Sequence, residues 1–296
     1  MQIRMTQQSA AANAMTGLQG NLSRLAKLQE QLSSGKLVSR PSDSPTAAVE
    51  AMQVRTELRA TEQYARNAQD GLAWLSITDT ALTNAAAQVR RARDLTLQGM
   101  SAGAANSSTA RQALALEVDN IRAELVGLAN TRYLDRPVFG GTTAGSDAYS
   151  GAGGYLGDTG RVMRTIGDGG VQVRVDTPAD QTFGDGPNGL FAVLEEISAG
   201  LRSPTGDLRS SLERLDTATT GLYAQLSDVG ARYNRLEQMQ KTADDRLLEL
   251  RSRLSQVEDI DLPQTIMELQ LQQTAYQAAL AATARVIQPS LVDFLR

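Results

Sequence analysis

The chain has 296 residues, of which 41% are hydrophobic and only 4% aromatic, and its formal net charge is −4. It contains no Cys and no His, which excludes disulfides, thiol nucleophiles, imidazole bases and His-based zinc sites. The acidic balance and the lack of any long apolar stretch predict no nucleic-acid partner and no membrane span.

The first predicted helix ends at Ser34 and carries the alternating three- and four-residue spacing of a heptad seam. Gly35 suits the left-handed position that ends a helix. Pro41 and Pro45 then forbid a continuous helix, and Ser44 before Pro45 is typical of an N-cap followed by a first-turn proline. The seam positions of this helix are Ala11, Met15, Leu18, Leu22, Leu25, Gln29 and Leu32.

Two more helices are predicted before residue 142. The seam of the second runs from Ala47 to Val89 and includes Leu58, Leu72, Leu75 and Leu82. A break at residues 99–108 separates it from the third helix, which gives way to Arg136 and Pro137. The apolar positions of this third helix are Leu114, Val118, Ile121, Leu125 and Leu128.

Residues 143–206 differ in character from the helices on either side. Glycines punctuate short polar runs, and Val171, Val173 and Val175 alternate with polar residues, as in a strand. The sequence predicts a short helix over Leu190–Leu201 and a hairpin turn at Asp168-Gly169-Gly170. We interpret the segment as a small β-rich outer domain inserted into a helical stem.

The fourth helical tract holds the heptad from Leu208 to Val257, and a last helix is predicted from Gln264 to about Gln288. Together the tracts predict a mainly α fold with a long antiparallel coiled-coil or helical-bundle stem over residues 46–142 and 207–258. Both terminal helices are expected at the same end of this stem. The core positions of the fourth tract include Leu222, Leu226, Val229, Tyr233, Leu236, Leu247, Leu250 and Leu254.

Two segments near the chain ends, residues 5–23 and 269–284, carry no charged side chain. A solitary surface helix normally has a charged face, whereas these small or neutral groups can be buried without leaving an unpaired charge. We interpret residues 1–34 and 264–296 as assembly helices that order when many copies pack together; the alternative is two frayed, alanine-rich tails. The predicted assembly residues are Met15, Leu18, Leu22, Leu25, Leu32, Ile266, Leu269, Tyr276, Leu280, Ile287 and Phe294.

Candidate chemistry is thin. The run Gly151–Gly157 only partly resembles a dinucleotide-binding loop, because its third glycine falls one place late and no long helix follows. Glu195-Glu196 and Asp244-Asp245 are adjacent carboxylates that point to different faces of a helix, so they make poor acid–base pairs. The sequence predicts no catalytic residue, no cofactor and no metal site, and a chain that is not an enzyme.

Both end regions contain recognisable motifs, namely Leu32–Lys36 (LSSGK), Pro41–Ala48 (PSDSPTAA), Tyr133–Thr142 (YLDRPVFGGT), Gln273–Leu280 (QTAYQAAL) and Ile287–Arg296 (IQPSLVDFLR). With these motifs the chain resembles the flagellin superfamily over about residues 1–142 and 207–296. Two prolines flank its N-terminal motif, a form typical of the hook–filament junction branch and usually lacking in filament-forming flagellins. Ser44 stands where a second aspartate is common.

The resemblance implies a structural subunit of the bacterial flagellum, exported unfolded without a cleavable signal peptide to an extracellular location. Its own copies would form a junction ring between the first hook-associated protein and flagellin. The terminal helices would line the inner tube, the stem would surround them, and the variable residues 143–206 would face outward. A dedicated flagellar export chaperone would bind the C-terminal segment before export.

Two alternatives stay open from the sequence. One is a filament-forming flagellin, which shares the stem and the terminal helices. The other is a cytoplasmic coiled-coil signalling or adaptor module, which predicts charged, independently folded ends and a stable dimer.

Overall fold

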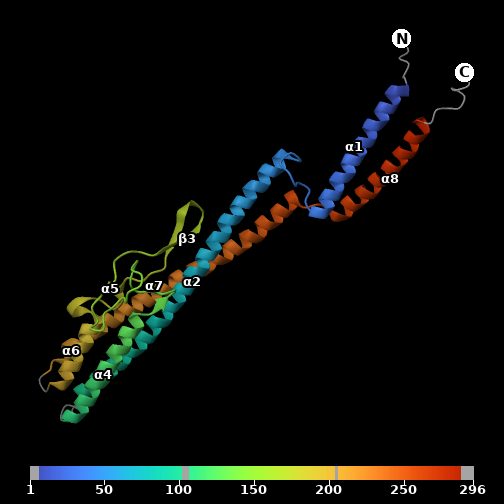
Figure 1. The fold of residues 1–296 in the computed structure, drawn as a ribbon. Coiled ribbons are helices and arrows are strands. Elements are labelled where there is room, and N and C mark those ends of the chain that lie inside the picture. Colours follow the sequence, from blue (N-terminus) through green and yellow to red (C-terminus); the bar gives the residue numbers. More distant parts are fainter. Residues whose placement is uncertain (1–6, 102–106, 204–205, 288–296) are drawn as a thin grey trace, which may run out of the picture. The chain divides into compact units, whose positions relative to one another are not determined.

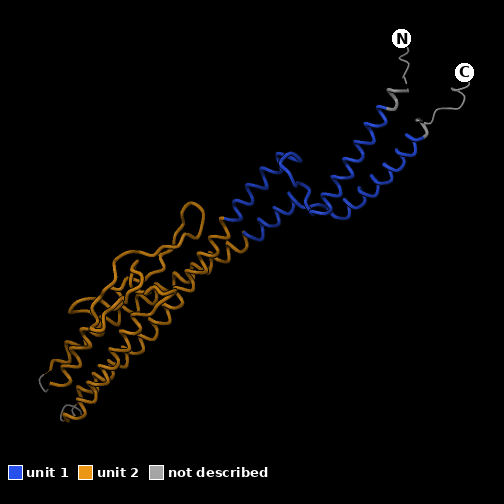
Figure 2. The backbone as a smooth tube through the Cα atoms, viewed as in Figure 1, with its two compact units in different colours: residues 1–59, 247–296 blue, residues 60–246 orange. Residues whose placement is uncertain are grey.

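The computed structural model describes residues 7–101, 107–203 and 206–287. The chain divides into two compact units (Figure 2). The terminal unit consists of residues 1–59 and 247–296, and the stem unit of residues 60–246. Each long helix of the stem therefore contributes residues to both units.

The protein is mainly helical, as the heptad pattern predicts, with two small antiparallel two-stranded sheets (Figure 1). Its longest helices are α2 and α7, with 56 and 51 residues. The elements are α1 (Gln7–Ser34), α2 (Pro45–Met100), α4 (Ser108–Ala129), β1 (Arg132–Tyr133), β2 (Arg136–Pro137), β3 (Met163–Gly167), β4 (Val171–Arg174), α5 (Ala179–Thr182), α6 (Leu190–Arg202), α7 (Leu208–Glu258) and α8 (Leu262–Ile287), with single 3₁₀ turns at Asp168–Gly170 and Gly186–Asn188.

The helix boundaries follow the glycine and proline signals closely. Gly35 has φ +70°, the left-handed conformation that ends α1. Ser44 Oγ accepts a hydrogen bond from the Ala47 N–H at 3.4 Å, which caps α2. Helix α8 begins at Leu262 rather than at the predicted Gln264, because Pro263 fits the first turn and Asp261 caps it by accepting the Gln264 N–H at 3.1 Å.

The core of the stem unit lies between α2, α4 and α7. Helix α7 contributes fully buried side chains every seven residues, at Leu215, Leu222, Val229 and Leu236. Arg93 of α2 pairs with Asp216 at 2.7 Å, while Gly71 of α2 lies beside Leu236, so the two helices run antiparallel here. Leu75, Leu82, Ile121 and Leu125 are buried in the same core, and Leu72 and Leu226 pack against it half-buried.

One predicted core residue lies elsewhere. Tyr233 is 36% exposed, because Val229 and Leu236 fill the seam at this level and the half-buried Arg232 covers the adjacent face. Arg232 donates to the Asp176 carbonyl at 2.8 Å and pairs with Asp228. Tyr233 thus leaves part of its ring in water, as amphipathic side chains often do.

The predicted core residues nearest the chain ends belong to the terminal unit. Leu247 and Leu250 of α7 are buried there at 8% and 1% exposure. Leu58 of α2 and Leu254 of α7 are half-buried.

Residues 143–206 belong to the stem unit and contain less strand than their alternation predicts. Strands β3 and β4 form the predicted hairpin, with Met163 opposite Arg174 and the turn at Asp168–Gly170. They span 5 and 4 residues, whereas α6 spans 13 and lies against α4. The many glycines explain the shortage of strand, because glycine favours turns over extended ladders. An aromatic cluster forms the core of this segment, with Tyr149, Phe183 and Phe191 from the segment and Phe139 from the chain just before it.

Candidate assembly interface

Helices α1 and α8 lie against each other in antiparallel fashion within the terminal unit (Figure 1). Of the six predicted seam positions of α1 whose side chains are described, Leu18, Leu25 and Leu32 are half-buried in the seam. The other three, Met15, Leu22 and Gln29, are exposed, and the side chain of Ala11 lies outside the described residues. From α8, Leu269 and Tyr276 are half-buried in the seam. The pair is therefore held by a narrow row of leucines rather than by a full core.

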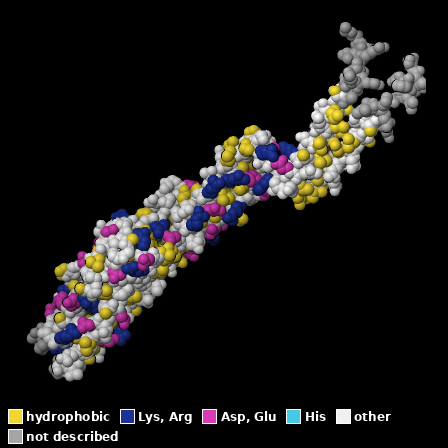
Figure 3. Space-filling model, viewed as in Figure 1, with side chains coloured by type: hydrophobic (Ala, Val, Ile, Leu, Met, Phe, Trp, Pro, Cys, Tyr) yellow, Lys and Arg dark blue, Asp and Glu magenta, His cyan; other side chains and the backbone are white. Residues whose placement is uncertain are grey.

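The outer face of this helix pair exposes a group of large apolar side chains. Leu271 is 72% exposed, Met267 64% and Met15 57%, and the space-filling view shows hydrophobic side chains gathered over α1 and α8 with few charges among them (Figure 3). Isolated surface leucines are ordinary, but a charge-poor apolar group of this kind marks a contact surface. We call the exposed large apolar side chains of these two helices together the outer apolar face; they are Met15, Leu22, Leu262, Ile266, Met267, Leu271 and Leu280.

Sequence reasoning missed Met267 and Leu271 because they fall outside a simple heptad. Ile266 and Leu280, both predicted assembly residues, lie on the outer apolar face at 38% and 44% exposure. Ile287 ends α8, but its side chain and all of Phe294 lie outside the described residues.

A polar contact interrupts the leucine seam. Gln272 of α8 donates its side-chain amide to both the backbone carbonyl and the side-chain oxygen of Asn21 at 3.3 Å. A single polar pair in an apolar helix seam lowers stability but fixes register, because a shifted alignment leaves the amides unpaired. The heptad pattern gives no sign of this contact, because a polar residue only interrupts the apolar repeat.

Replacing both amides by leucine should strengthen the pair and loosen its specificity. We expect amide hydrogen exchange over residues 12–34 and 262–284 to slow in Asn21→Leu/Gln272→Leu, while the purified chain self-associates more readily in light scattering. Gln277→Leu is the matched control, because Gln277 is exposed in α8 and adds an apolar group away from the seam. Faster exchange in the double variant would contradict a register-setting role.

The turn after α1 is fastened to the end of α7 by backbone and charge. The Leu37 N–H donates to the Glu258 carbonyl at 2.6 Å, and the Ile260 N–H donates to the Gly35 carbonyl at 3.2 Å. The Lys36 ammonium lies 2.7 Å from Asp259 Oδ1 and 3.3 Å from Glu258 Oε2. We call this arrangement the joint.

Glu258 is the buried member of the joint. Its side chain is only 4% exposed, and its second cation is Arg55 of α2 at 2.8 Å. Two carboxylates and two cations from opposite ends of the sequence thus neutralise one another. A buried carboxylate requires such partners, since an unpaired charge in this position would be costly.

The joint shifts the pKa values of its exposed members. The hydrogen bond to Asp259 raises the pKa of the Lys36 ammonium, and the hydrogen bonds from Lys36 and Ser255 lower the pKa of the Asp259 carboxyl.

Asp43, in the proline-flanked loop, accepts the Arg40 N–H at 3.0 Å and pairs with Lys27 at 3.1 Å. These two contacts, the backbone N–H first, lower the pKa of Asp43.

Acid should therefore weaken the terminal unit. Because the folded-state pKa values of Asp43 and Asp259 are lowered, their stabilisation is complete above the unfolded value, about 4, and is lost as the pH falls through the folded values. We expect the protection factors of amides in the terminal unit, that is, their exchange relative to the intrinsic rate at each pH, to fall below about pH 4. Asp259→Asn should remove part of this dependence. Asp168→Asn, in an exposed turn of the stem unit, should not change it.

Neither metal chemistry nor a membrane span is indicated where the structure is described. Across residues 7–101, 107–203 and 206–287, no three Cys, Asp or Glu side chains are grouped to hold a metal ion. No helix in these ranges has both the length and the hydropathy to cross a bilayer.

The chain is similar to known flagellar proteins over most of its length. The chain is 26% identical to flagellar hook-associated protein 3 of Escherichia coli K12, covering 95% of this chain and 96% of that protein. It is 25% identical to a flagellin of Bacillus subtilis 168, covering 97% of each chain. The solved structure of the flagellar junction protein FlgL from Legionella pneumophila is 16% identical and has a TM-score of 0.56, covering 71% of this chain and 99% of that one.

Two regions of the chain match the two helical regions that define bacterial flagellins. Residues 5–142 match the bacterial flagellin N-terminal helical region, and residues 212–295 match the C-terminal helical region. The first match includes α1, the proline-flanked loop and Lys36 of the joint, while the second includes Glu258, Asp259 and α8. The two halves of the joint and of the helix pair thus come from the two matched regions, and the chain belongs to the flagellin family.

Proposed function

We propose that this chain is a structural subunit of the bacterial flagellum that joins the hook to the filament. The observation that carries the proposal is the outer apolar face of the α1–α8 pair, which has few charges and no partner of its own within the described residues. Such a face is suited to burial between subunits. The names of the relatives support a flagellar role, and the hook-associated proteins among them favour the junction.

In this function the terminal helices line the inner tube of a ring, and the stem surrounds them. Residues 143–206 face outward. The first hook-associated protein lies on one side of the ring, flagellin lies on the other, and copies of this chain lie beside each other. The charge-free segments of these helices, residues 5–23 and 269–284, suit the tube because burial on many sides leaves no charge unpaired there.

Export fits the same picture. The subunit leaves the cell unfolded through the flagellar export apparatus, and a dedicated chaperone covers the apolar residues of the C-terminal segment beforehand. The leucine seam and its polar pair contribute little stability, so the α1–α8 pair opens at low cost.

A second function is a filament subunit, favoured by the 25% identity to the Bacillus subtilis flagellin over 97% of the chain. Gene deletion separates the two. Under the junction proposal the deletion strain assembles hooks but sheds flagellin monomers into the medium, and the wild-type gene restores filaments. If the strain instead makes no flagellin at all, this chain is the filament subunit; normal filaments contradict both functions.

A further inference from the structure

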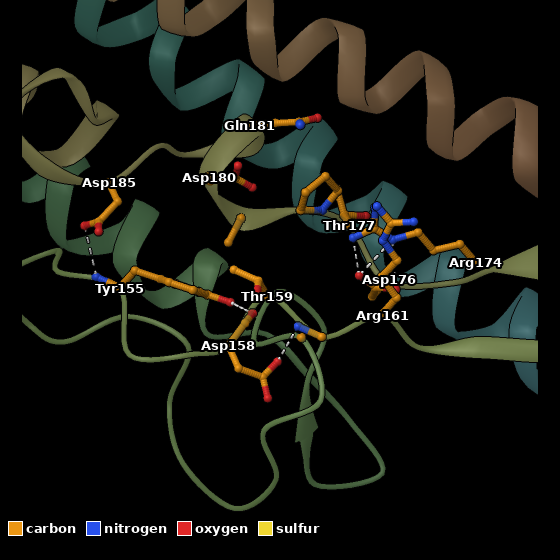
Figure 4. A pocket seen from close by; sticks show the side chains of 14 residues that line it. Tyr155, Asp158, Thr159, Arg161, Arg174, Asp176, Thr177, Asp180, Gln181 and Asp185 are labelled. Carbon is orange, nitrogen blue, oxygen red and sulfur yellow. Dashed lines mark hydrogen bonds and ion pairs between the residues drawn. The ribbon is translucent and has the colours of Figure 1, made fainter.

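A hollow of about 350 Å³, lined mostly by polar residues, opens in the stem unit beside α5. Its labelled walls come from three segments: the loop from Tyr155 to Arg161, the end of β4 from Arg174 to Thr177, and α5 with Asp185 beyond it (Figure 4). The volume is in the range of small-molecule binding sites. Nothing in the assembly function uses it.

Part of the wall is fixed by internal hydrogen bonds. The Tyr155 hydroxyl donates to the Asp158 carbonyl at 2.7 Å, and Asp158 Oδ1 accepts the Thr142 and Gly160 N–H groups at 2.7 and 2.9 Å. Burial raises the pKa of Tyr155 to about 12, so its hydroxyl stays a neutral donor. On the other side of the hollow, the buried Asp176 pairs with Arg174 and accepts a hydrogen bond from the Val162 N–H, each at 2.6 Å. These contacts preorganise the hollow without filling it.

Other polar groups in the wall remain available to bond a ligand. Thr177 is 1% exposed, and its hydroxyl has no hydrogen-bond partner among the described residues. A buried hydroxyl without a partner is unfavourable unless a ligand or water meets it. Asp180 and Arg161 are exposed at the rim, and neither forms an ion pair within the described part of the chain.

A second hollow of about 400 Å³ lies on the other side of α5 and shares Asp180 and Gln181 with the first. Arg214 lines it, bound through its terminal nitrogen to Glu196 at 2.7 Å and to the Pro187 carbonyl at 3.0 Å. Its Nε is buried and lacks a partner among the described residues. Two neighbouring hollows with one shared wall suit a ligand longer than a single ring.

The lining decides the chemistry of that ligand. None of the large apolar side chains exposed in the described structure lines either hollow, so the anchors that a protein or peptide partner needs are missing. Outside the Arg174–Asp176 and Arg214–Glu196 pairs, the lining carries three carboxylates and one cation, an acidic balance that disfavours a polyanion; these residues are Asp158, Asp180, Asp185 and Arg161. Carboxylate, guanidinium, amide and hydroxyl groups together match a ligand that donates and accepts many hydrogen bonds.

We propose that the two hollows on either side of α5 form a binding site for an oligosaccharide, with Thr177 and Asp180 as hydrogen-bonding residues. The site is built from residues of the stem unit, whereas α1 and α8 belong to the terminal unit. It therefore adds a sugar-binding activity to the assembly function and does not depend on that function.

The test uses the full chain, labelled on its amines, on a printed array of oligosaccharides that covers neutral, N-acetylated and acidic sugars. The labels do not block the site, because Lys27, Lys36 and Lys241 all lie outside the two hollows. The best-binding oligosaccharide is then titrated calorimetrically against wild type, Thr177→Val and Asp180→Asn. Asp168→Asn, in the exposed β3–β4 turn, is the control.

We expect Thr177→Val and Asp180→Asn each to weaken binding about tenfold, and Asp168→Asn to leave it unchanged. The melting temperature of Thr177→Val should not fall, because the hydroxyl it removes makes no internal hydrogen bond. The proposal is overturned if no sugar on the array binds, if both variants bind like wild type, or if the chain binds an extended peptide library and no sugar.

Discussion

A chain carrying Leu22→Glu and Leu271→Glu is expected to fold normally and to fail in assembly. Both side chains lie on the outer apolar face, 51% and 72% exposed, so the monomer loses little on substitution, within about 0.5 kcal/mol each. In an assembled ring the same positions would hold unpaired charges in an apolar contact, which costs several kcal/mol. The double variant therefore separates an effect on assembly from an effect on folding.

Complementation of the deletion strain measures this effect. The double variant should leave cells non-motile with flagellin shed into the medium, while circular dichroism of the purified chain shows unchanged helix content and melting. Leu156→Glu is the matched control, because Leu156 is 56% exposed but belongs to the stem unit and to neither α1 nor α8. Normal filaments with the double variant would show that the outer apolar face is not an assembly contact.

The stem was predictable because its signal is local and repeated. A heptad that persists over α7 places Leu222, Val229 and Leu236 on one face whatever their partner is, and the structure buries all three. Glycine and proline boundaries were equally readable, since Gly35 and Pro45 act through their own backbones. The same logic failed at Tyr233, where the packing of Arg232 rather than the repeat decides exposure.

The terminal pair was predictable only in outline. The charge-free segments located the interface, but a narrow helix pair has two candidate apolar stripes, and the heptad chose Met15 and Leu22 for the seam although both face outward. The contact between Asn21 and Gln272 joins residues 251 positions apart, and neither residue carries a seam signal of its own. Such contacts become visible only once the chain ends are brought together.

The joint is a similar case with a larger energetic consequence. Lys36 and Arg55 contact Glu258 from more than 200 residues away, so no spacing in the sequence reveals them. The Leu32–Lys36 motif marks where one cation lies, but only the structure shows its acidic partner. The motif thus acquires a physical role: it fastens the turn after α1 to the end of α7.

Removing both cations of the joint should destabilise the terminal unit far more than removing an exposed pair. Lys36→Ala/Arg55→Ala leaves the 4% exposed Glu258 carboxylate unpaired, and we expect a loss of about 3 kcal/mol, at the lower end for buried pairs because both cations are themselves half-exposed. Arg253→Ala is the matched control: it breaks the exposed Arg253–Glu50 contact, also between α7 and α2, at 3.0 Å and should cost less than about 1 kcal/mol.

Adding Glu258→Gln to the double variant tests the cause. If the destabilisation comes from an unpaired buried charge, neutralising that charge should recover a large part of it, although a third residue has been changed. Hydrogen exchange over the terminal unit and urea unfolding measure the stability of the wild type, Arg253→Ala, the double variant and the triple variant. A triple variant no more stable than the double, or a double variant no weaker than Arg253→Ala, would mean that packing and the backbone bonds from Leu37 and Ile260 hold the joint without help from charge.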